Sequence, residues 1–186
     1  MSLYGEAMSD LLAKDPRFLI LPEKDVTDSF QNAEDLGVKK GSKMFSYALQ
    51  ATLGVGKEKL DRKRLCFSTL GFSEKQISEF LKLQPKFLGL SEEKVKRNVD
   101  FLVNSAGLLL DNFVRYPALF GFSLEKRIIP RYRVMEALKS MQVLKTKVSF
   151  PAVSRYSERK FFEKYIHSNA ESSVLLDIYH GRQVDH

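Results

Sequence analysis

Residues 81–88 read LKLQPKFL, and residues 113–120 return to the same arrangement as FVRYPALF. In each block a proline stands four positions after an apolar residue and is followed, one residue later, by an apolar pair. The two prolines, Pro85 and Pro117, lie 32 residues apart, and Pro151 follows after another 34. The proline-marked block therefore recurs with a period of about 34 residues.

A second marker recurs at the same spacing. Gly37, Gly71 and Gly107 each follow a leucine or an alanine, and the steps between these glycines are 34 and 36 residues. Pro16 also fits the proline series, and one proline is missing near Ala51, where the register expects it. Because two independent markers recur at the same spacing, we predict that the chain is an array of repeats.

Each repeat is predicted to contain two helices. In the repeat after Pro85, Ser91 is suited to cap a helix, and four apolar residues then fall at helical spacing on one face, namely Val95, Val99, Leu102 and Ala106. Gly107 suits the left-handed turn that ends a helix. A short second helix over 108–115 must end before Pro117, because the residue before a proline is pushed out of helical geometry. We therefore expect each of the three later motif prolines, at 85, 117 and 151, to lie directly after a short second helix.

The helix that begins at Ser123 contains Pro130 seven residues into its apolar pattern. We expect this helix to be kinked or to start with an irregular turn. No stretch alternates apolar and polar residues between hairpin turns, which argues against strands. Two helices per repeat, stacked through their apolar faces, give an α-solenoid with a continuous core. The predicted fold class is therefore all-α.

The composition restricts the other possibilities. The chain has 186 residues, of which 44% are hydrophobic and 28% charged, values that fit one globular domain. Cys66 is the only cysteine, so a disulfide scaffold and a multi-cysteine zinc site are both excluded. No apolar run approaches the roughly 20 residues that a membrane helix needs. The opening residues, which include Glu6 and Asp10, do not fit a targeting segment, so either none is needed or one precedes residue 1 and has been lost.

The positive charge is concentrated in one part of the sequence. Residues 1–93 contain 14 Lys and Arg against 14 Asp and Glu, whereas residues 94–164 contain 15 against six, a balance of +9. Such a segment attracts phosphate backbones or anionic surfaces. A solvated surface that only aids solubility is the alternative.

The repeats resemble those of the mitochondrial transcription termination factor (mTERF) family. The resemblance rests on three blocks of the form Leu/Phe-x-x-x-Pro, at 12–16, 81–85 and 113–117. It also rests on two further segments, 116–131 and 161–165. The segment 116–131, YPALFGFSLEKRIIPR, is similar to the C-terminal repeats of plant members. The match covers roughly residues 9–180 and is specific in 72–166. The missing proline near Ala51 departs from the pattern.

The resemblance implies a right-handed α-solenoid of about four to five repeats, each with two helices and a short 3₁₀ turn at the motif proline. We expect one helical-repeat domain over residues 1–186, with 167–186 as a C-terminal tail. The family's curved, basic solenoid binds nucleic acid in mitochondria or chloroplasts and acts in transcription, transcript maturation or translation. The resemblance thus implies a monomeric, non-catalytic regulator of organellar gene expression that binds DNA or RNA through phosphates, without cofactor, membrane or small-molecule substrate.

Four basic residues form the first candidate site, namely Lys126, Arg127, Arg131 and Arg133. Residues 127 and 131 are one helical turn apart and share a face if the helix continues through Pro130. Arginine suits phosphate because its planar fork donates two parallel hydrogen bonds. The alternative is that one of these arginines caps or bridges a neighbouring repeat, for example through Glu136.

Further basic residues point away from the apolar stripes. One such stripe is flanked by Lys94, Lys96 and Arg97, and a later one is followed by Lys139, Lys145 and Lys147. On the concave side of a solenoid they would meet nucleic acid, and on the convex side they would meet solvent. The aromatic residues after the motif prolines, Phe87, Phe120 and Phe122, could stack on bases but are more typical of a core.

Catalysis has almost no support in the sequence, and an enzyme is the third hypothesis. His167, His180 and His186 all lie in the last 20 residues, and none has a cysteine at metal-ligand spacing. Cys66 lies on or near an apolar stripe, which favours packing over nucleophilic chemistry. A protein-binding scaffold for an acidic partner is the second hypothesis, and a groove lined by exposed apolar residues would favour it.

Overall fold

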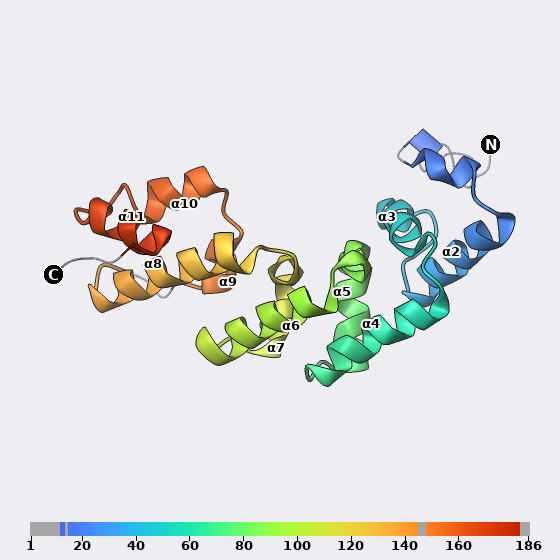
Figure 1. Ribbon diagram of the computed structural model, residues 1–186, viewed down its shortest axis with the longest axis horizontal. Helices are drawn as coiled ribbons and strands as arrows, with labels where there is room; N and C mark the ends of the chain where they lie inside the picture. Colours follow the sequence, from blue (N-terminus) through green and yellow to red (C-terminus); the bar gives the residue numbers. More distant parts are fainter. Residues whose placement is uncertain (1–11, 14, 145–147, 183–186) are drawn as a thin grey trace. The chain divides into compact units, whose positions relative to one another are not determined.

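A computed structural model describes residues 12–13, 15–144 and 148–182 of the chain. Helices account for all of the regular structure in these ranges, and no strand occurs in them (Figure 1). The predicted all-α class is therefore confirmed. Lys145 and Lys147, two of the candidate cations, lie outside these ranges, as do the first eleven residues and the last four.

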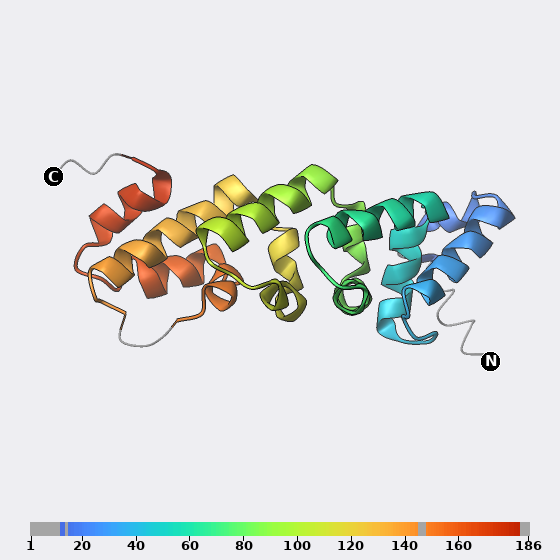
Figure 2. The ribbon, with the colours of Figure 1, turned by 90° about the horizontal axis from the view of Figure 1, so that it is seen from below.

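The chain divides into two compact units, Met1–Lys96 and Arg97–His186, and the boundary falls within one helix, α6. The first unit contains the helices η1 (Pro16–Leu19), α2 (Glu23–Asp35), α3 (Lys43–Thr52), α4 (Lys57–Thr69), α5 (Glu74–Leu83), η2 (Pro85–Gly89) and the start of α6 (Glu92–Asp100). Helices α2 and α3 pack side by side, and α3 and α5 both pack on η2 (Figure 2). The expectation of a single domain stays a prediction.

The second unit begins with the end of α6. Its further elements are η3 (Phe101–Ser105), α7 (Leu110–Arg115), η4 (Pro117–Phe120), η5 (Leu124–Ile128), α8 (Ile129–Ser140), α9 (Phe150–Ser154), α10 (Glu158–Tyr165) and α11 (Ser172–His180). Two of these, η3 and η5, are π-helical turns that adjoin α6 and α8. Each therefore widens one turn of the long first helix of its repeat.

The glycine marker sits where the first helix of each repeat ends. Gly37, Gly71 and Gly107 all adopt left-handed backbone, with φ of 74°, 92° and 66°. A residue without a Cβ adopts this conformation without strain. Gln142 has the same conformation, with φ of 57°, after the end of α8. The helix-ending turn thus recurs at residues 37, 71, 107 and 142, which extends the predicted period to a position where the sequence has no glycine.

Two of the three later motif prolines lie where they were predicted. Pro85 and Pro117 begin the 3₁₀ turns η2 and η4, directly after α5 and α7. The prediction for Pro151 was wrong, because it stands in the first turn of α9 and does not follow a second helix. Proline is well tolerated there, since the first N–H groups of a helix have no partner within it. At the position of the missing proline near Ala51, α3 ends at Thr52 and no 3₁₀ turn follows.

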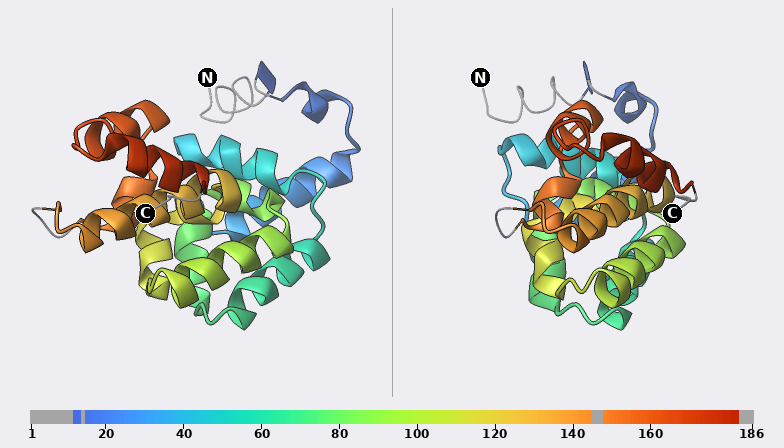
Figure 3. Two further views of the ribbon diagram at one scale, coloured as in Figure 1. Left: turned by 60° about the vertical axis from the view of Figure 1, so that its left-hand side comes forward. Right: turned by 90° about the vertical axis from the view of Figure 1, so that its left-hand side faces the viewer.

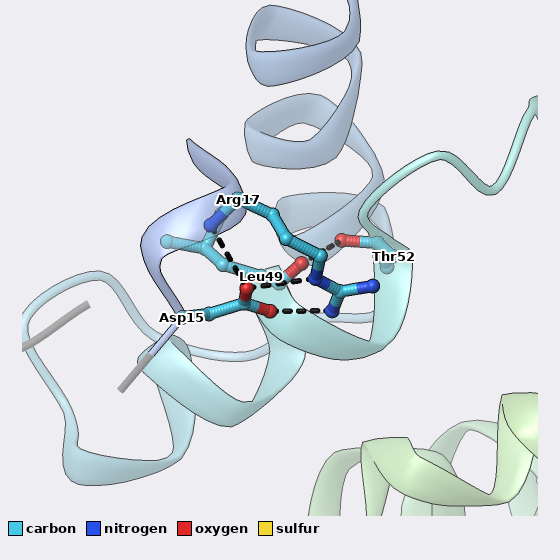
Figure 4. A network of polar contacts seen from close by, with 4 residues as sticks. All are labelled: Asp15, Arg17, Leu49 and Thr52. Carbon is cyan, nitrogen blue, oxygen red and sulfur yellow. Dashed lines mark hydrogen bonds and ion pairs between the residues drawn. The ribbon is translucent and has the colours of Figure 1, made fainter. Parts of the chain in front are cut away.

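The earliest proline, Pro16, begins the 3₁₀ turn η1. The Asp15 carboxylate holds this turn by accepting hydrogen bonds from Arg17, at 3.2 Å from the backbone N, 2.7 Å from Nε and 2.5 Å from Nη2 (Figure 4). These bonds hold the pKa of Asp15 below its ordinary value. In the same view, the Thr52 hydroxyl donates to the carbonyl of Leu49 at 3.2 Å.

The expected irregularity near Pro130 is confirmed. In η5 the N–H groups of Arg127 and Ile128 both donate to the Ser123 carbonyl at 3.1 Å, and α8 then continues to Ser140. In a regular helix the ring of Pro130 would meet the carbonyl of Lys126, and a widened turn makes room for it. The helix therefore survives the proline, which keeps residues 127 and 131 on one face.

Each unit has its own apolar core. In the first, the rings of Phe67 and Phe80 pack edge to face with centroids 4.6 Å apart, and Phe72 packs on Phe80 at 5.6 Å. In the second, the buried cluster comes from α8 to α11 and consists of Val134, Met135, Leu138, Val153, Phe161, Tyr165, Ile166, Leu175 and Tyr179.

The segment expected as a C-terminal tail, 167–186, contains the helix α11. This helix packs along α8 (Figure 3), and its residues Leu175 and Tyr179 are 0% and 7% exposed. Its apolar residues complete the core of the second unit, so the chain stays ordered well beyond residue 167. Residues 183–186 of the expected tail are not among those the structure describes.

Candidate nucleic-acid interface

A polar side chain on the first helix of each repeat donates hydrogen bonds to backbone carbonyls at the end of the same repeat. Asn32 on α2 donates through Nδ2 to the Val55 carbonyl at 2.9 Å, and Lys63 on α4 donates to the Leu90 carbonyl. Asn98 on α6, which is 1% exposed, donates to three carbonyls, those of Leu119 (2.9 Å), Phe120 (3.2 Å) and Phe122 (3.0 Å). We call this arrangement the repeat clasp, since it satisfies carbonyls that a turn leaves without partners.

Arg127 and Arg131 form the clasp of the following repeat. Arg131 donates through Nη1 to the carbonyls of Ser154 (2.9 Å), the last residue of α9, and Tyr156 (2.7 Å), two residues further on. Arg127 donates to the same two carbonyls, through Nε at 2.9 Å and Nη2 at 2.7 Å. The two arginines do share a face, as expected, and that face points toward α9.

Both guanidinium groups also lie over aromatic rings, Arg131 at 4.8 Å from the centroid of Phe161 and Arg127 at 4.2 Å from that of Phe122. Such cation–π contacts add to the hydrogen bonds that hold the arginines in place. Burial lowers the pKa of Arg131, and the positive charge of Arg127 lowers it further. The pair therefore acts in folding.

These contacts disfavour the phosphate role predicted for the two arginines. Arg131 is 1% exposed, so no phosphate can reach its guanidinium, and Arg127 is half-buried with two of its donors on carbonyls. The contacts instead match the alternative, in which an arginine bridges to a neighbouring segment. Its acceptors are backbone carbonyls and not Glu136, which instead pairs with Lys139 at 2.6 Å.

The remaining candidates differ in what surrounds them. Lys126 and Arg133 are exposed, and Arg133 lies beside Gly181, where an added Cβ would meet its Nη1 at 3.0 Å. Arg97 and Lys139 are exposed but pair with Glu125 and Glu136. Exposed ion pairs of this kind are worth about 0–1 kcal/mol, so a phosphate can replace the carboxylate. Lys94 is half-buried and belongs to the first unit, so the candidate set falls into two parts.

A group of cations and tyrosines that the sequence reasoning did not name lies at the ends of α7 and α9 and on α10. We call it the tyrosine–cation cluster, and its members are Tyr116, Arg155, Tyr156, Lys160, Lys164 and Tyr165. Lys160 and Lys164 place their ammonium groups 4.6 and 5.5 Å from the ring centroid of Tyr156. The guanidinium of Arg155 lies 5.8 Å from the ring centroid of Tyr116, which joins the end of α7 to the end of α9. The Tyr156 ring stacks on Tyr165 at 6.2 Å and 17°.

A signal for this cluster was present in the sequence. Lys160 and Lys164 are four residues apart, so a helix places them on one face, and Tyr165 follows directly. The charge count over 94–164 included these cations, but the candidate residues were chosen elsewhere in that segment. The proximity of Tyr116 to Arg155 had no sequence signal, because it depends on how α7 and α9 pack.

Sites of other kinds find little support. Among the residues that the structure describes, no group of three or more His, Cys, Asp and Glu side chains could hold a metal ion. Cys66 is buried, and burial raises the pKa of its thiol, as expected for a packing residue. A cleft of about 380 Å³ in the first unit is lined by Lys59, Arg62 and Glu92 as well as by apolar side chains. In the described part of the chain no helix is both long and apolar enough to cross a bilayer.

Comparison with known proteins agrees with this architecture. The model of the mTERF family matches residues 1–162, which is most of the chain. The protein therefore belongs to the mTERF family.

Two curated relatives from Arabidopsis thaliana are similar to the chain. One is the mitochondrial transcription termination factor MTERF15, with 23% identity over 101 residues, which is 54% of this chain and 23% of the relative. The other is the chloroplastic transcription termination factor MTERF8, with 24% identity over 133 residues, which is 72% of this chain and 26% of the relative. The chain thus spans about a quarter of the length of each relative.

Proposed function

We propose that this chain is a nucleic-acid-binding regulator of gene expression in a mitochondrion or chloroplast, and that it binds phosphates through exposed cations of its second unit. The observation that carries the proposal is a set of six exposed cations with no described carboxylate within 4.0 Å, namely Arg115, Lys126, Arg133, Arg155, Lys160 and Lys164. Membership of the mTERF family supports it, as do relatives that are named transcription termination factors.

The physical reason is the release of counterions. A nucleic acid carries a condensed layer of small cations, and each Lys or Arg that replaces them at a phosphate releases part of that layer. Cations already paired with a carboxylate gain less, because the partner must first be displaced. The unpaired cations of the second unit are therefore the ones expected to contribute most. DNA and RNA both offer such phosphates, so the proposal includes both.

The test is a salt titration of binding with labelled 20-residue DNA and RNA oligonucleotides and the full chain. Replacing Lys126 and Arg133 together by Gln should reduce the slope of log affinity against log salt by about 0.9 per lost contact on duplex DNA, or ~0.7 on a single strand. The matched control replaces Lys57 and Lys75, two exposed lysines of the first unit, and changes the net charge equally.

Three outcomes are informative. A flatter slope for the variant and an unchanged slope for the control would support the proposal. Equal slopes for wild type, variant and control would exclude Lys126 and Arg133 from the interface. A wild-type chain that binds no oligonucleotide at low salt would contradict the proposal and favour a protein-binding scaffold.

A further inference from the structure

We propose that the tyrosine–cation cluster holds an unpaired base of a single strand, with the base on the Tyr156 ring and the flanking phosphates on Lys160, Lys164 and Arg155. This inference rests on the proposed function and specifies its ligand as single-stranded nucleic acid. Three observations carry it: the placement of the ring, the position of the cations over it, and the burial or coverage of the candidate aromatic residues that follow the motif prolines.

The ring of Tyr156 is supported from within the fold. It stacks nearly parallel on Tyr165, at 17°, and Tyr165 is only 5% exposed. Tyr165 in turn packs on Phe161, with centroids 5.4 Å apart. Tyr156 itself is half-buried, so it has a supported face and an accessible part. A rigid aromatic ring of this kind is the usual platform for a base.

The cations lie close enough to the Tyr156 ring to meet the phosphates of a nucleotide whose base stacks on it. Lys160 and Lys164 are exposed and reach the ring of Tyr156 at 4.6 and 5.5 Å, while the exposed Arg155 precedes it in the chain. An exposed cation–π contact is worth only about 0.5–1 kcal/mol, so a base can displace an ammonium group from the ring. The displaced ammonium then lies next to the backbone of the same nucleotide, where it meets a phosphate.

The other candidate aromatic residues are not available for stacking. Phe87 and Phe120, which follow motif prolines, are 1% and 0% exposed and form part of the core. Phe122 is half-buried and is covered by Arg127, whose donors hold the clasp. Tyr116, with Arg155 over its ring, is the second accessible ring of the cluster.

This arrangement favours a single strand over a duplex. In a duplex each base is already stacked between its neighbours and paired, so a ring can reach it only after the base is extruded, at a cost of a few kcal/mol. An unpaired base pays no such cost. Because every base has an aromatic face, the cluster should accept different bases with little preference.

The test uses the absence of tryptophan from the chain. The variant Tyr156→Trp keeps an aromatic ring and introduces a single fluorophore, whose emission a stacked base should quench. The probes are (dT)20, (U)20 and a 20-base-pair DNA duplex, titrated at one fixed salt concentration. The control is Tyr47→Trp, which places the same fluorophore at a half-exposed position of the first unit.

We expect (dT)20 or (U)20 to quench Tyr156→Trp and not Tyr47→Trp, and to bind more tightly than the duplex. The two single strands show whether DNA, RNA or both supply the base. Tyr156→Leu should weaken single-strand binding about 5- to 150-fold, the effect of losing one stacked base, and leave duplex binding unchanged. Replacing Lys160 and Lys164 by Gln gives a second variant that leaves the ring in place, and it should weaken single-strand binding as well.

The contradicting results separate the two proposals. If the chain binds oligonucleotides but Tyr156→Trp is not quenched, or if the duplex binds more tightly, the inference is wrong and the proposed function stands. If no oligonucleotide binds, both are wrong. Circular dichroism of each variant checks that a weaker affinity does not come from unfolding.

Discussion

From the clasp formed by Arg127 and Arg131 we predict how much stability the protein loses when either or both arginines are replaced. Both side chains donate to the carbonyls of Ser154 and Tyr156, so each carbonyl has two donors. Replacing one arginine leaves every carbonyl with the other donor. Replacing both leaves two carbonyls without a side-chain donor, and a buried carbonyl without a partner costs about 1–3 kcal/mol. The effects of the two substitutions should therefore not add.

The single substitutions set the scale. Arg131→Ala removes three hydrogen bonds, to the carbonyls of Val153, Ser154 and Tyr156, and also the contact of the buried guanidinium with the Phe161 ring. We therefore expect the free energy of unfolding to fall by about 2–4 kcal/mol. Arg127→Ala, at a half-buried position, should cost about 1–2 kcal/mol. The double variant should exceed the sum of the two by about 1–2 kcal/mol.

Urea unfolding of the four proteins, followed by circular dichroism, measures these differences. Ser157, an exposed residue near the clasp whose side chain accepts from the Lys160 N–H, provides a control, since Ser157→Ala removes a helix cap without touching the clasp. Additive effects, within about 0.3–0.5 kcal/mol, would refute the shared-acceptor account. So would an Arg131→Ala protein as stable as the wild type.

Three other predictions concern the repeat joints and the clasps. Gln142→Gly should stabilise the protein by about 0.5–1 kcal/mol in a urea titration, because a φ of 57° strains any residue with a Cβ. Gly107→Ala should destabilise it for the same reason, and a stabilising alanine would contradict the left-handed conformation of residue 107. Asn98→Asp should destabilise the protein, more at about pH 7 than at about pH 4, because an ionised carboxylate would face three carbonyls, whereas a pH-independent loss would argue against that contact. The pKa of Asp15 is lowered by its bonds to Arg17, so their stabilisation is present above the ordinary Asp value of 3.8 and is lost as the pH falls below it. Acid titration of wild type against Asp15→Asn, followed by circular dichroism, checks this, and identical acid profiles would refute it.

The periodicity was readable because its markers act locally. A glycine that ends a helix needs only its own backbone conformation, and a proline that starts a 3₁₀ turn needs only its own ring. The positions of Gly71, Gly107, Pro85 and Pro117 were therefore predictable. Pro151 was not, because a proline also fits the first turn of a helix, and the pattern alone does not separate the two uses.

The candidate site was harder to predict because charge does not indicate direction. Helical spacing placed Arg127 and Arg131 on one face but could not say that the face packs against α9. The polar residues of the other clasps, Asn32, Lys63 and Asn98, resemble surface residues in the sequence, and only the chain path brings them to carbonyls 21 to 27 residues away. Some cations thus donate to backbone carbonyls within the fold, and others remain exposed.

We propose that nucleic acid contacts the second unit at its exposed cations and tyrosines. Ultraviolet crosslinking of the full chain to a single strand that contains 5-bromouracil, followed by peptide mass spectrometry, tests it directly. We predict crosslinked peptides that contain Tyr116 or Tyr156 and that disappear when unlabelled strand is added in excess. Crosslinks confined to peptides from residues 15–96, or none that the competitor removes, would contradict the claim.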